Sequence, residues 1–376
     1  MRRLIVCVIV LLCVLSGCVR NPSVHSPGEY TPVEPVGEVP AAFADIVKDN
    51  LFQSVTAFED RLLCVEEAPT DTFTVRMYDY QGAQLAIYSC EAEHTSFMDN
   101  GLIATSDGGF LFVLGFYDEY DGGLRGGTDG LWASENGVSS RIVKCTTDGR
   151  LEWACVAENY DGSMLQYAFE GEDAYYFFGA QETPETDTVG VYSPTDIHLM
   201  KMSKSGTILK TATVGGGDYD SVNAVQEEGG AFDLYCRVQS DDGDFSSSGE
   251  WRLRVDAELQ VLSKTKVDKT PSEAIGLIDG KPVTAEHALF KNFEDGRPSA
   301  VLDYDDFYLV VSENITGIYE DTPLAISSIW YYTETVYGAY DESGKLLWKA
   351  TVDSSPDYDA MRDAFESEWE YSEEPV

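Results

Sequence analysis

Much of the chain follows one pattern: two short stretches of alternating apolar and polar residues, separated by a turn that contains glycine. The copies "RIVKCTTDGRLEW" (141–153), "HLMKMSKSGTILK" (198–210) and "ALFKNFEDGRPSA" (288–300) each place a lysine five residues before the glycine. Alternation with a period of two predicts β-strands, and glycine supplies the positive φ that a tight hairpin turn needs. Each copy therefore predicts a β-hairpin.

Looser copies extend the series in both directions. "VRMYDYQGAQLAI" centres on Gly82, "YGAYDESGKLLWK" centres on Gly344, and "LRVDAELQVLSK" around Leu259 keeps the alternation without its glycine. With Gly149, Gly206 and Gly296 these make six turn centres. Their spacing is near the size of a four-stranded propeller blade, about 40–50 residues.

A second hairpin pattern lies upstream of four of these turns. It reads strand, acidic or glycine turn, then aromatic strand, in "SVTAFEDRLLCV", "GLIATSDGGFLFVLGF", "MLQYAFEGEDAYYFFGA" and "SVNAVQEEGGAFDLYC". Two hairpins per unit predict an all-β fold: a single β-propeller of about six or seven four-stranded blades over residues 41–376. Two β-sandwiches in tandem are the alternative, and residues 265–335 do not follow the repeat cleanly.

These repeats resemble those of bacterial β-propeller lipoproteins, which combine a Gly-Gly turn, a lysine-bearing strand and an Asp-Gly…Trp hairpin. The resemblance covers residues 51–358. It implies the propeller fold and leaves the activity open, because propellers host many unrelated functions.

The N-terminus has the features of an export signal. Met1–Arg3 is positively charged, and the apolar run Leu4–Leu15 is shorter than the roughly 20 residues that span a bilayer. The run ends in Leu-Ser-Gly-Cys, which resembles the lipobox of bacterial lipoproteins. That resemblance implies cleavage between Gly17 and Cys18 and a diacylglycerol, with further acylation such as palmitate, on Cys18. A plain secretory signal or an uncleaved anchor, with an incidental Cys18, is the alternative.

Residues 18–40 are predicted to be a flexible tether between the lipid and the propeller. They are poor in bulky apolar residues and contain Pro22, Pro27, Pro32, Pro35 and Pro40. Such segments favour extended polyproline II, at about 3.1 Å per residue. The expected order is therefore a signal peptide (1–17), a lipid-anchored tether (18–40) and a propeller (41–376). The protein is expected on the bacterial cell membrane, facing outside the cytoplasm.

The net charge and the cysteine content exclude further classes of protein. The formal net charge of −41 makes binding to nucleic acid unfavourable. The cysteines after Cys18 are odd in number and scattered, which does not indicate a disulfide scaffold: Cys64, Cys90, Cys145, Cys155 and Cys236. Hairpin geometry also predicts that Cys145 and Cys155 are too far apart to be bonded.

Motifs that carry chemistry are sparse. His94, His198 and His287 are not at metal-ligand spacing, and the sequence has no Cys-x-x-Cys, P-loop or Gly-x-Ser-x-Gly. The acidic stretches 117–123 and 240–250 lack the EF-hand spacing, so solvated loops are expected there rather than calcium sites. No catalytic residue, cofactor or metal ligand is predicted.

Two functional classes remain open. The preferred one is a membrane-anchored binding or scaffold protein that uses its propeller loops to bind a cationic ligand, a glycan or a protein. The alternative is an exported propeller enzyme that acts on a polysaccharide or a cell-wall component. Converging carboxylates in the axial funnel would favour the enzyme.

Overall fold

The computed structural model describes residues 33–355 with internal gaps. The gaps are 53–54, 69–71, 92–94, 98–100, 118–137, 157–162, 183–194, 216–219, 240–243, 273, 280, 291–296, 305 and 319–330. The predicted signal peptide, its cleavage site and Cys18 therefore lie outside the described residues, as does His94. Within the described part, no helix is both long and apolar enough to cross a membrane. The sheets belong mainly to one compact unit, Val33–Asn314 with Glu334–Ser355.

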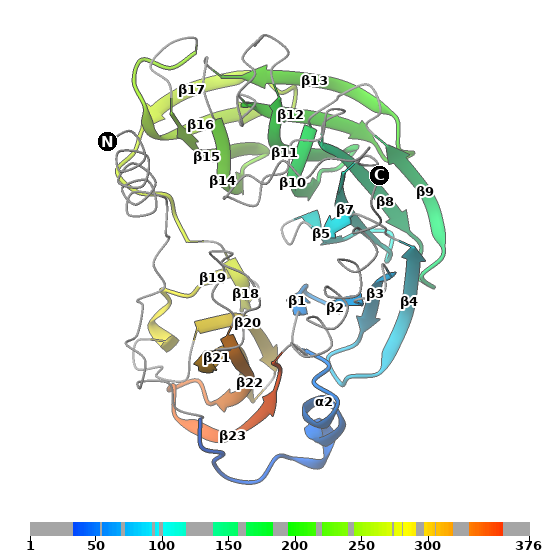
Figure 1. Cartoon of the computed structure of the whole chain (residues 1–376), viewed down its shortest axis with the longest axis vertical. Helices are drawn as coiled ribbons and strands as arrows, with labels where there is room; N and C mark the ends of the chain where they lie inside the picture. The colour runs from blue at the N-terminus through cyan, green and yellow to red at the C-terminus, as the bar shows by residue number, and fades with distance from the viewer. Residues whose placement is uncertain are drawn as a thin grey trace, which may run out of the picture. The chain divides into compact units, whose positions relative to one another are not determined.

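The described strands form five sheets, which are the five blades of a β-propeller (Figure 1). Blade 1 contains β1 (Val55–Ala57), β2 (Leu62–Ala68), β3 (Thr72–Tyr78) and β4 (Gln84–Glu91). Blade 2 contains β5 (Thr95–Phe97), β6 (Ile103–Ala104), β7 (Phe110–Tyr117), β8 (Val138–Cys145) and β9 (Leu151–Val156). Blade 3 contains β10 (Ser163–Glu170), β11 (Ala174–Glu182), β12 (Thr195–Ser203) and β13 (Ile208–Val214).

Blades 4 and 5 complete the fold. Blade 4 contains β14 (Asp220–Glu228), β15 (Ala231–Val238), β16 (Gly249–Asp256) and β17 (Val261–Lys266). Blade 5 contains β18 (Ala274–Ile278), β19 (Lys281–Thr284), β20 (Arg297–Tyr304), β21 (Phe307–Ile318), β22 (Tyr331–Tyr340) and β23 (Leu346–Asp353). In blade 5 the hairpin β18–β19 adds to the row β20–β23, with β18 parallel to β20.

The all-β propeller prediction is confirmed, but the predicted count of six or seven blades is wrong. The overcount comes from "ALFKNFEDGRPSA", whose sequence pattern predicts a hairpin like the others. Its first residues, Ala288–Phe290, form a 3-10 helix, η3, and only Arg297 onward is a strand. That strand, β20, pairs with β21 and not with an upstream partner from the same copy. The alternation of apolar and polar residues did not distinguish a β-hairpin from a short helix followed by a strand.

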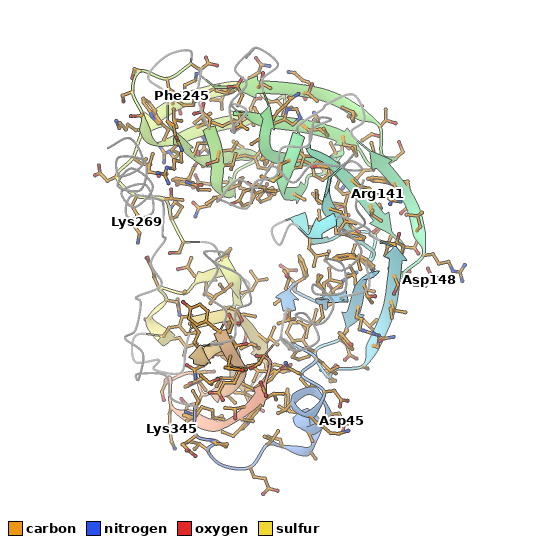
Figure 2. All side chains as sticks on the ribbon, viewed as in Figure 1. Asp45, Arg141, Asp148, Phe245, Lys269 and Lys345 are labelled. Carbon is orange, nitrogen blue, oxygen red and sulfur yellow. The ribbon has the colours of Figure 1, made fainter. Side chains whose placement is uncertain are left out.

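The five remaining copies form the same outer hairpin in every blade. In blade 1 the Asp79 N–H donates to the Ala83 carbonyl and the Gly82 N–H donates to the Asp79 carbonyl. Equivalent bonds join 146–150, 203–207, 256–260 and 341–345. The fourth turn residue has a positive φ each time, and Leu259 takes the place of glycine in blade 4. Figure 2 labels Asp148 and Lys345 in two of these turns.

Buried apolar clusters join neighbouring blades face to face. One lies between blades 1 and 2 and includes Phe73 and Phe112, whose ring centroids are 5.1 Å apart. Similar clusters join blades 2 and 3 and blades 3 and 4. A fourth joins the last blade to the first, through Leu62 of β2 and Leu309 of β21. The hydrophobic core is therefore distributed along the interfaces between blades.

The N-terminal segment fills the junction between blades 5 and 1. Val36 pairs with Lys349 of β23 through two backbone hydrogen bonds of 2.9 and 2.8 Å. The short helices η1 (Ala41–Phe43) and α2 (Ala44–Lys48) follow. The Tyr337 hydroxyl oxygen is 3.2 Å from the Phe52 N–H that donates to it and 2.8 Å from Asn50 Oδ1. Part of the segment predicted as a tether thus contacts the last blade.

The lysine of the repeat is a buried charge in blade 2. Lys144 is 1% exposed, and its ammonium group donates to Asp107 at 2.8 Å and to Glu152 at 3.2 Å. Burial raises the pKa of Asp107, but hydrogen bonds from Lys144, Thr105 and a backbone N–H outweigh this and bring it to about 2. A buried lysine is tolerated only when it is paired and hydrogen-bonded in this way.

Candidate functional site

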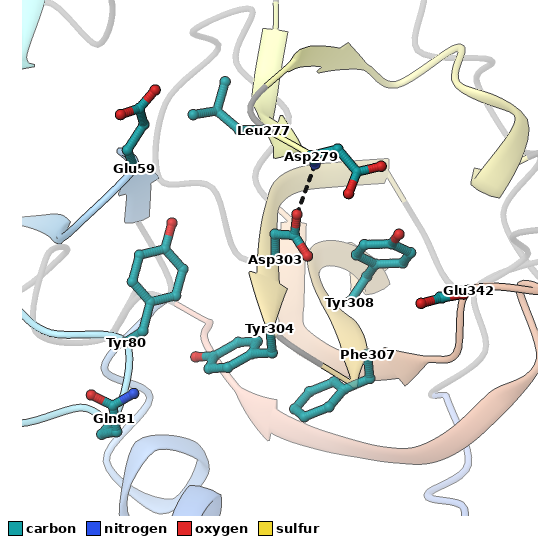
Figure 3. A pocket seen from close by; sticks show the side chains of 10 residues that line it. All are labelled: Glu59, Tyr80, Gln81, Leu277, Asp279, Asp303, Tyr304, Phe307, Tyr308 and Glu342. Atoms are coloured by element: carbon teal, nitrogen blue, oxygen red, sulfur yellow. Dashed lines mark hydrogen bonds between the residues drawn. The ribbon is translucent and has the colours of Figure 1, made fainter.

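A pocket of about 580 Å³ lies between blades 1 and 5, and it is the candidate functional site (Figure 3). Both blades contribute side chains to it. Blade 1 supplies Glu59, Tyr80 and Gln81, and blade 5 supplies Leu277, Asp279, Asp303, Tyr304, Phe307, Tyr308 and Glu342. The lining thus contains four carboxylates, three tyrosines and one phenylalanine, and it contains no lysine, arginine or histidine.

The β20–β21 hairpin positions four of these residues. Tyr304 lies directly opposite Phe307 across the turn, and Asp303 lies opposite Tyr308 in the next pair. Side chains alternate between the two faces of a strand. The pair Tyr304 and Phe307 therefore lies on one face of the hairpin, and the pair Asp303 and Tyr308 lies on the other. The rings of Tyr304 and Phe307 stack, with centroids 4.9 Å apart and planes 6° apart.

The β18–β19 hairpin brings a second carboxylate to the pocket. Asp279 has φ 52° in the tight turn of "IDGK", a conformation that Asp adopts more readily than most residues. Its backbone N–H donates to Asp303 Oδ2 at 2.8 Å, the bond drawn in Figure 3. β18 approaches β20 closely at Gly276, where a Cβ atom would lie 2.1 Å from the Val301 carbonyl oxygen. Only glycine permits this approach.

The outer turns of the two blades complete the pocket. Tyr80 follows Asp79 in the turn of blade 1, and Glu342 follows Asp341 in the turn of blade 5. These two pocket residues therefore occupy equivalent positions of the repeat. The Tyr80 hydroxyl donates to the Phe58 carbonyl at 2.6 Å, which fixes the ring at the wall of the pocket.

The carboxylates make the pocket electrically negative. None of the four forms a salt bridge with a described residue. The pKa of Tyr308 is raised by burial and then by Asp303, Asp279 and Glu342, whose charges oppose a phenolate. Burial, with further effects from Asp303 and Asp60, raises the pKa of Tyr80 to about 12. Both tyrosines therefore present neutral rings at neutral pH.

Phe43 of the N-terminal segment packs against the aromatic residues of the pocket. The ring of Phe43 lies edge-on to Tyr304 and Phe307, with centroids 5.2 and 5.5 Å away. Tyr80 also meets Tyr304 edge-on at 5.6 Å. The Tyr304 hydroxyl oxygen is buried and has no hydrogen-bond partner among the residues that the structure describes. A buried hydroxyl without a partner is unfavourable by about 1–3 kcal/mol.

The residues considered from sequence as possible ligands are not brought together. His198 is buried in β12 of blade 3, and burial lowers its pKa to about 4, whereas His287 is exposed in blade 5. Cys145 and Cys155 are not joined by a disulfide bond, and their strand partners are Leu151 and Ile142, respectively. The acidic stretch 117–123 lies almost wholly outside the described residues. Across the described ranges, no group of three His, Cys, Asp or Glu side chains is close enough to hold a metal ion.

Comparisons with known proteins give no family for this chain. No family model matches it, and no curated protein matches its sequence. Among solved structures, an α-L-arabinofuranosidase from Lactobacillus brevis is 12% identical with a TM-score of 0.38, covering 78% of this chain and 91% of that one. A variant of a Synechocystis apocarotenoid oxygenase is 14% identical with a TM-score of 0.34, covering 79% and 71%. With likeness this low, the assignment of the chain as a five-bladed β-propeller rests on its own strand order and pairing.

Proposed function

We propose that the protein is a binding protein, anchored outside the cytoplasm by a lipid on Cys18, and that the pocket between blades 1 and 5 is its ligand site. The observation that carries this proposal is the lining of that pocket. It combines aromatic side chains with four carboxylates in about 580 Å³. Small-molecule sites typically have volumes of about 300–1,000 Å³ and use aromatic walls together with placed polar groups, and this pocket is richer in charge than most.

The proposal of a lipid anchor is based on the Leu-Ser-Gly-Cys sequence at the end of the apolar run. It can be tested separately from the pocket. Replacing Cys18 with serine removes the thiol that would carry the lipid. Cells grown with radiolabelled palmitate are expected to label the wild-type chain and the Cys13→Ser control, and to leave Cys18→Ser unlabelled and unprocessed. Normal labelling and processing of Cys18→Ser would exclude the anchor.

The pocket is tested by separating binding from turnover. The full chain, purified in detergent, is titrated with chitohexaose, spermidine and lysozyme-digested peptidoglycan, and products are followed by mass spectrometry. We expect at least one probe to bind and remain unchanged. Tyr308→Ala, which removes a ring from the pocket wall, should weaken that binding at least tenfold, because aromatic contacts contribute strongly in partly buried sites.

Tyr235→Ala is the matched control, since Tyr235 lies on β15 of blade 4, away from the pocket lining. It should leave the affinity unchanged. Product formation that Asp303→Asn abolishes would instead establish the exported enzyme, with the pocket carboxylates as its acid–base groups. If Tyr308→Ala leaves the binding unchanged, the ligand binds elsewhere on the molecule.

A further inference from the structure

The chemical character of the pocket identifies the class of ligand, if the pocket is the binding site proposed above. Asp279, Asp303 and Glu342 lie around Tyr308, and Glu59 of blade 1 lines the same pocket (Figure 3). A ligand with negative charge is repelled by this arrangement. A neutral ligand leaves the four like charges without compensation, whereas a cation is attracted to all of them.

The aromatic side chains, like the carboxylates, favour a cationic ligand. The face of a tyrosine or phenylalanine ring is electron-rich, and it attracts ammonium and guanidinium groups placed over it. Tyr308 lies among the carboxylates, and the stacked pair Tyr304 and Phe307 adds an apolar surface beside it. The pocket thus offers a place for positive charge next to a place for hydrocarbon.

An inorganic cation does not fit this arrangement. Calcium takes six to eight oxygen ligands at about 2.3–2.6 Å, which requires several carboxylates to converge on one point. The acidic side chains of the pocket do not converge in that way, since the described part of the chain contains no metal-compatible group of three. Carboxylates spread over a pocket of about 580 Å³ match a charge carried on a larger, organic body.

We propose that the pocket binds a small organic cation, with its ammonium or guanidinium group against the Tyr308 ring among Asp279, Asp303 and Glu342. The hydrocarbon part of the ligand lies along Tyr304 and Phe307.

The test compares charged probes with neutral isosteres on the full chain in detergent. Choline is paired with 3,3-dimethyl-1-butanol, which has the same shape without the charge, and spermidine and arginine amide extend the series. By calorimetry, we expect at least one cation to bind and the neutral alcohol to bind at least tenfold more weakly. The affinity should fall as NaCl rises from 0.1 to 1 M, because the Debye length falls from about 10 to about 3 Å.

Two substitutions remove pocket charge and leave the backbone undisturbed. Asp279→Asn is suited to the positive φ at that turn, and Glu342→Gln lies in an exposed turn. Each should weaken cation binding about three- to tenfold, and the pair should weaken it more than tenfold. Glu227→Gln, which removes an exposed charge from β14 of blade 4, should have no effect.

The outcomes separate this inference from the proposed function. Equal binding of the neutral alcohol, or an unchanged affinity in Asp279→Asn and Glu342→Gln, overturns the cation assignment. If chitohexaose binds, no cation does, and Tyr308→Ala abolishes that binding, the pocket is a ligand site for neutral molecules. If no probe responds to Tyr308→Ala, both the site and the cation assignment fail.

Discussion

Replacing Gly149 with alanine is expected to lower the free energy of unfolding by about 2–5 kcal/mol, measured in urea. Gly149 has φ 76°, a conformation that is unfavourable for an L-residue by about 1–2 kcal/mol. The new Cβ atom would also lie 2.3 Å from the carbonyl oxygen and 2.8 Å from the carbonyl carbon of Ile87, in β4 of blade 1. Backbone cannot move aside as a side chain can, so overpacking adds about 1–3 kcal/mol.

Gly344 offers a matched control for that substitution. It occupies the same turn position in blade 5, with φ 78°, but its nearest neighbour would be a Leu289 methyl group at 3.8 Å. Gly344→Ala should therefore show the conformational effect alone, about 1–2 kcal/mol. Equal losses for the two variants would show that the contact between the turn of blade 2 and the outer strand of blade 1 is not tight.

Replacing Phe52 with alanine should also lower the free energy of unfolding by about 3–5 kcal/mol. Phe52 is fully buried in the cluster that joins blades 5 and 1, and its ring meets Tyr78 edge-on at 6.3 Å. The substitution leaves a cavity at the junction where the first and last blades are held together. Its effect should appear in urea unfolding followed by tyrosine and tryptophan fluorescence.

The control for Phe52→Ala is Leu347→Ala, on β23 of the same junction. Leu347 is 44% exposed, so its truncation should change the unfolding free energy by no more than about 0.5 kcal/mol. A loss below about 1 kcal/mol for Phe52→Ala would mean that the N-terminal segment contributes little to joining the two blades.

The sequence predicted the repeated hairpin well because the turn chemistry is local. Gly82, Gly149, Gly206 and Gly344 each need a positive φ, and alternation of side chains continues on both sides. Leu259 was also placed correctly, although its side chain is buried where the other blades have glycine. The predicted number of blades was wrong because of Ala288–Phe290. Over so short a stretch, three helical residues and the start of a strand give the same alternation of apolar and polar residues as a hairpin.

The candidate site could not be predicted because it depends on contact between residues far apart in the chain. Tyr80 and Asp303 come from opposite ends of the propeller sequence and meet only because the last blade packs on the first. One signal was present in the repeat: Tyr80 and Glu342 occupy equivalent turn positions, so they belong on the same end of the propeller. The hairpin β18–β19, which supplies Asp279, interrupts the repeat and gave no signal of its position.

The position of Phe43 has a mechanical consequence. A pulling force on the chain upstream of Val33 would first load the hydrogen bond from the Val33 N–H to Glu334 Oε1, and then the two backbone hydrogen bonds that pair Val36 with Lys349. The load would then pass to Phe43, which lies against Tyr304 and Phe307 at the back of the pocket. Tension along the N-terminal segment would thus be transmitted to the wall of the proposed ligand site, and a ligand bound at that site would in turn resist extension of the segment.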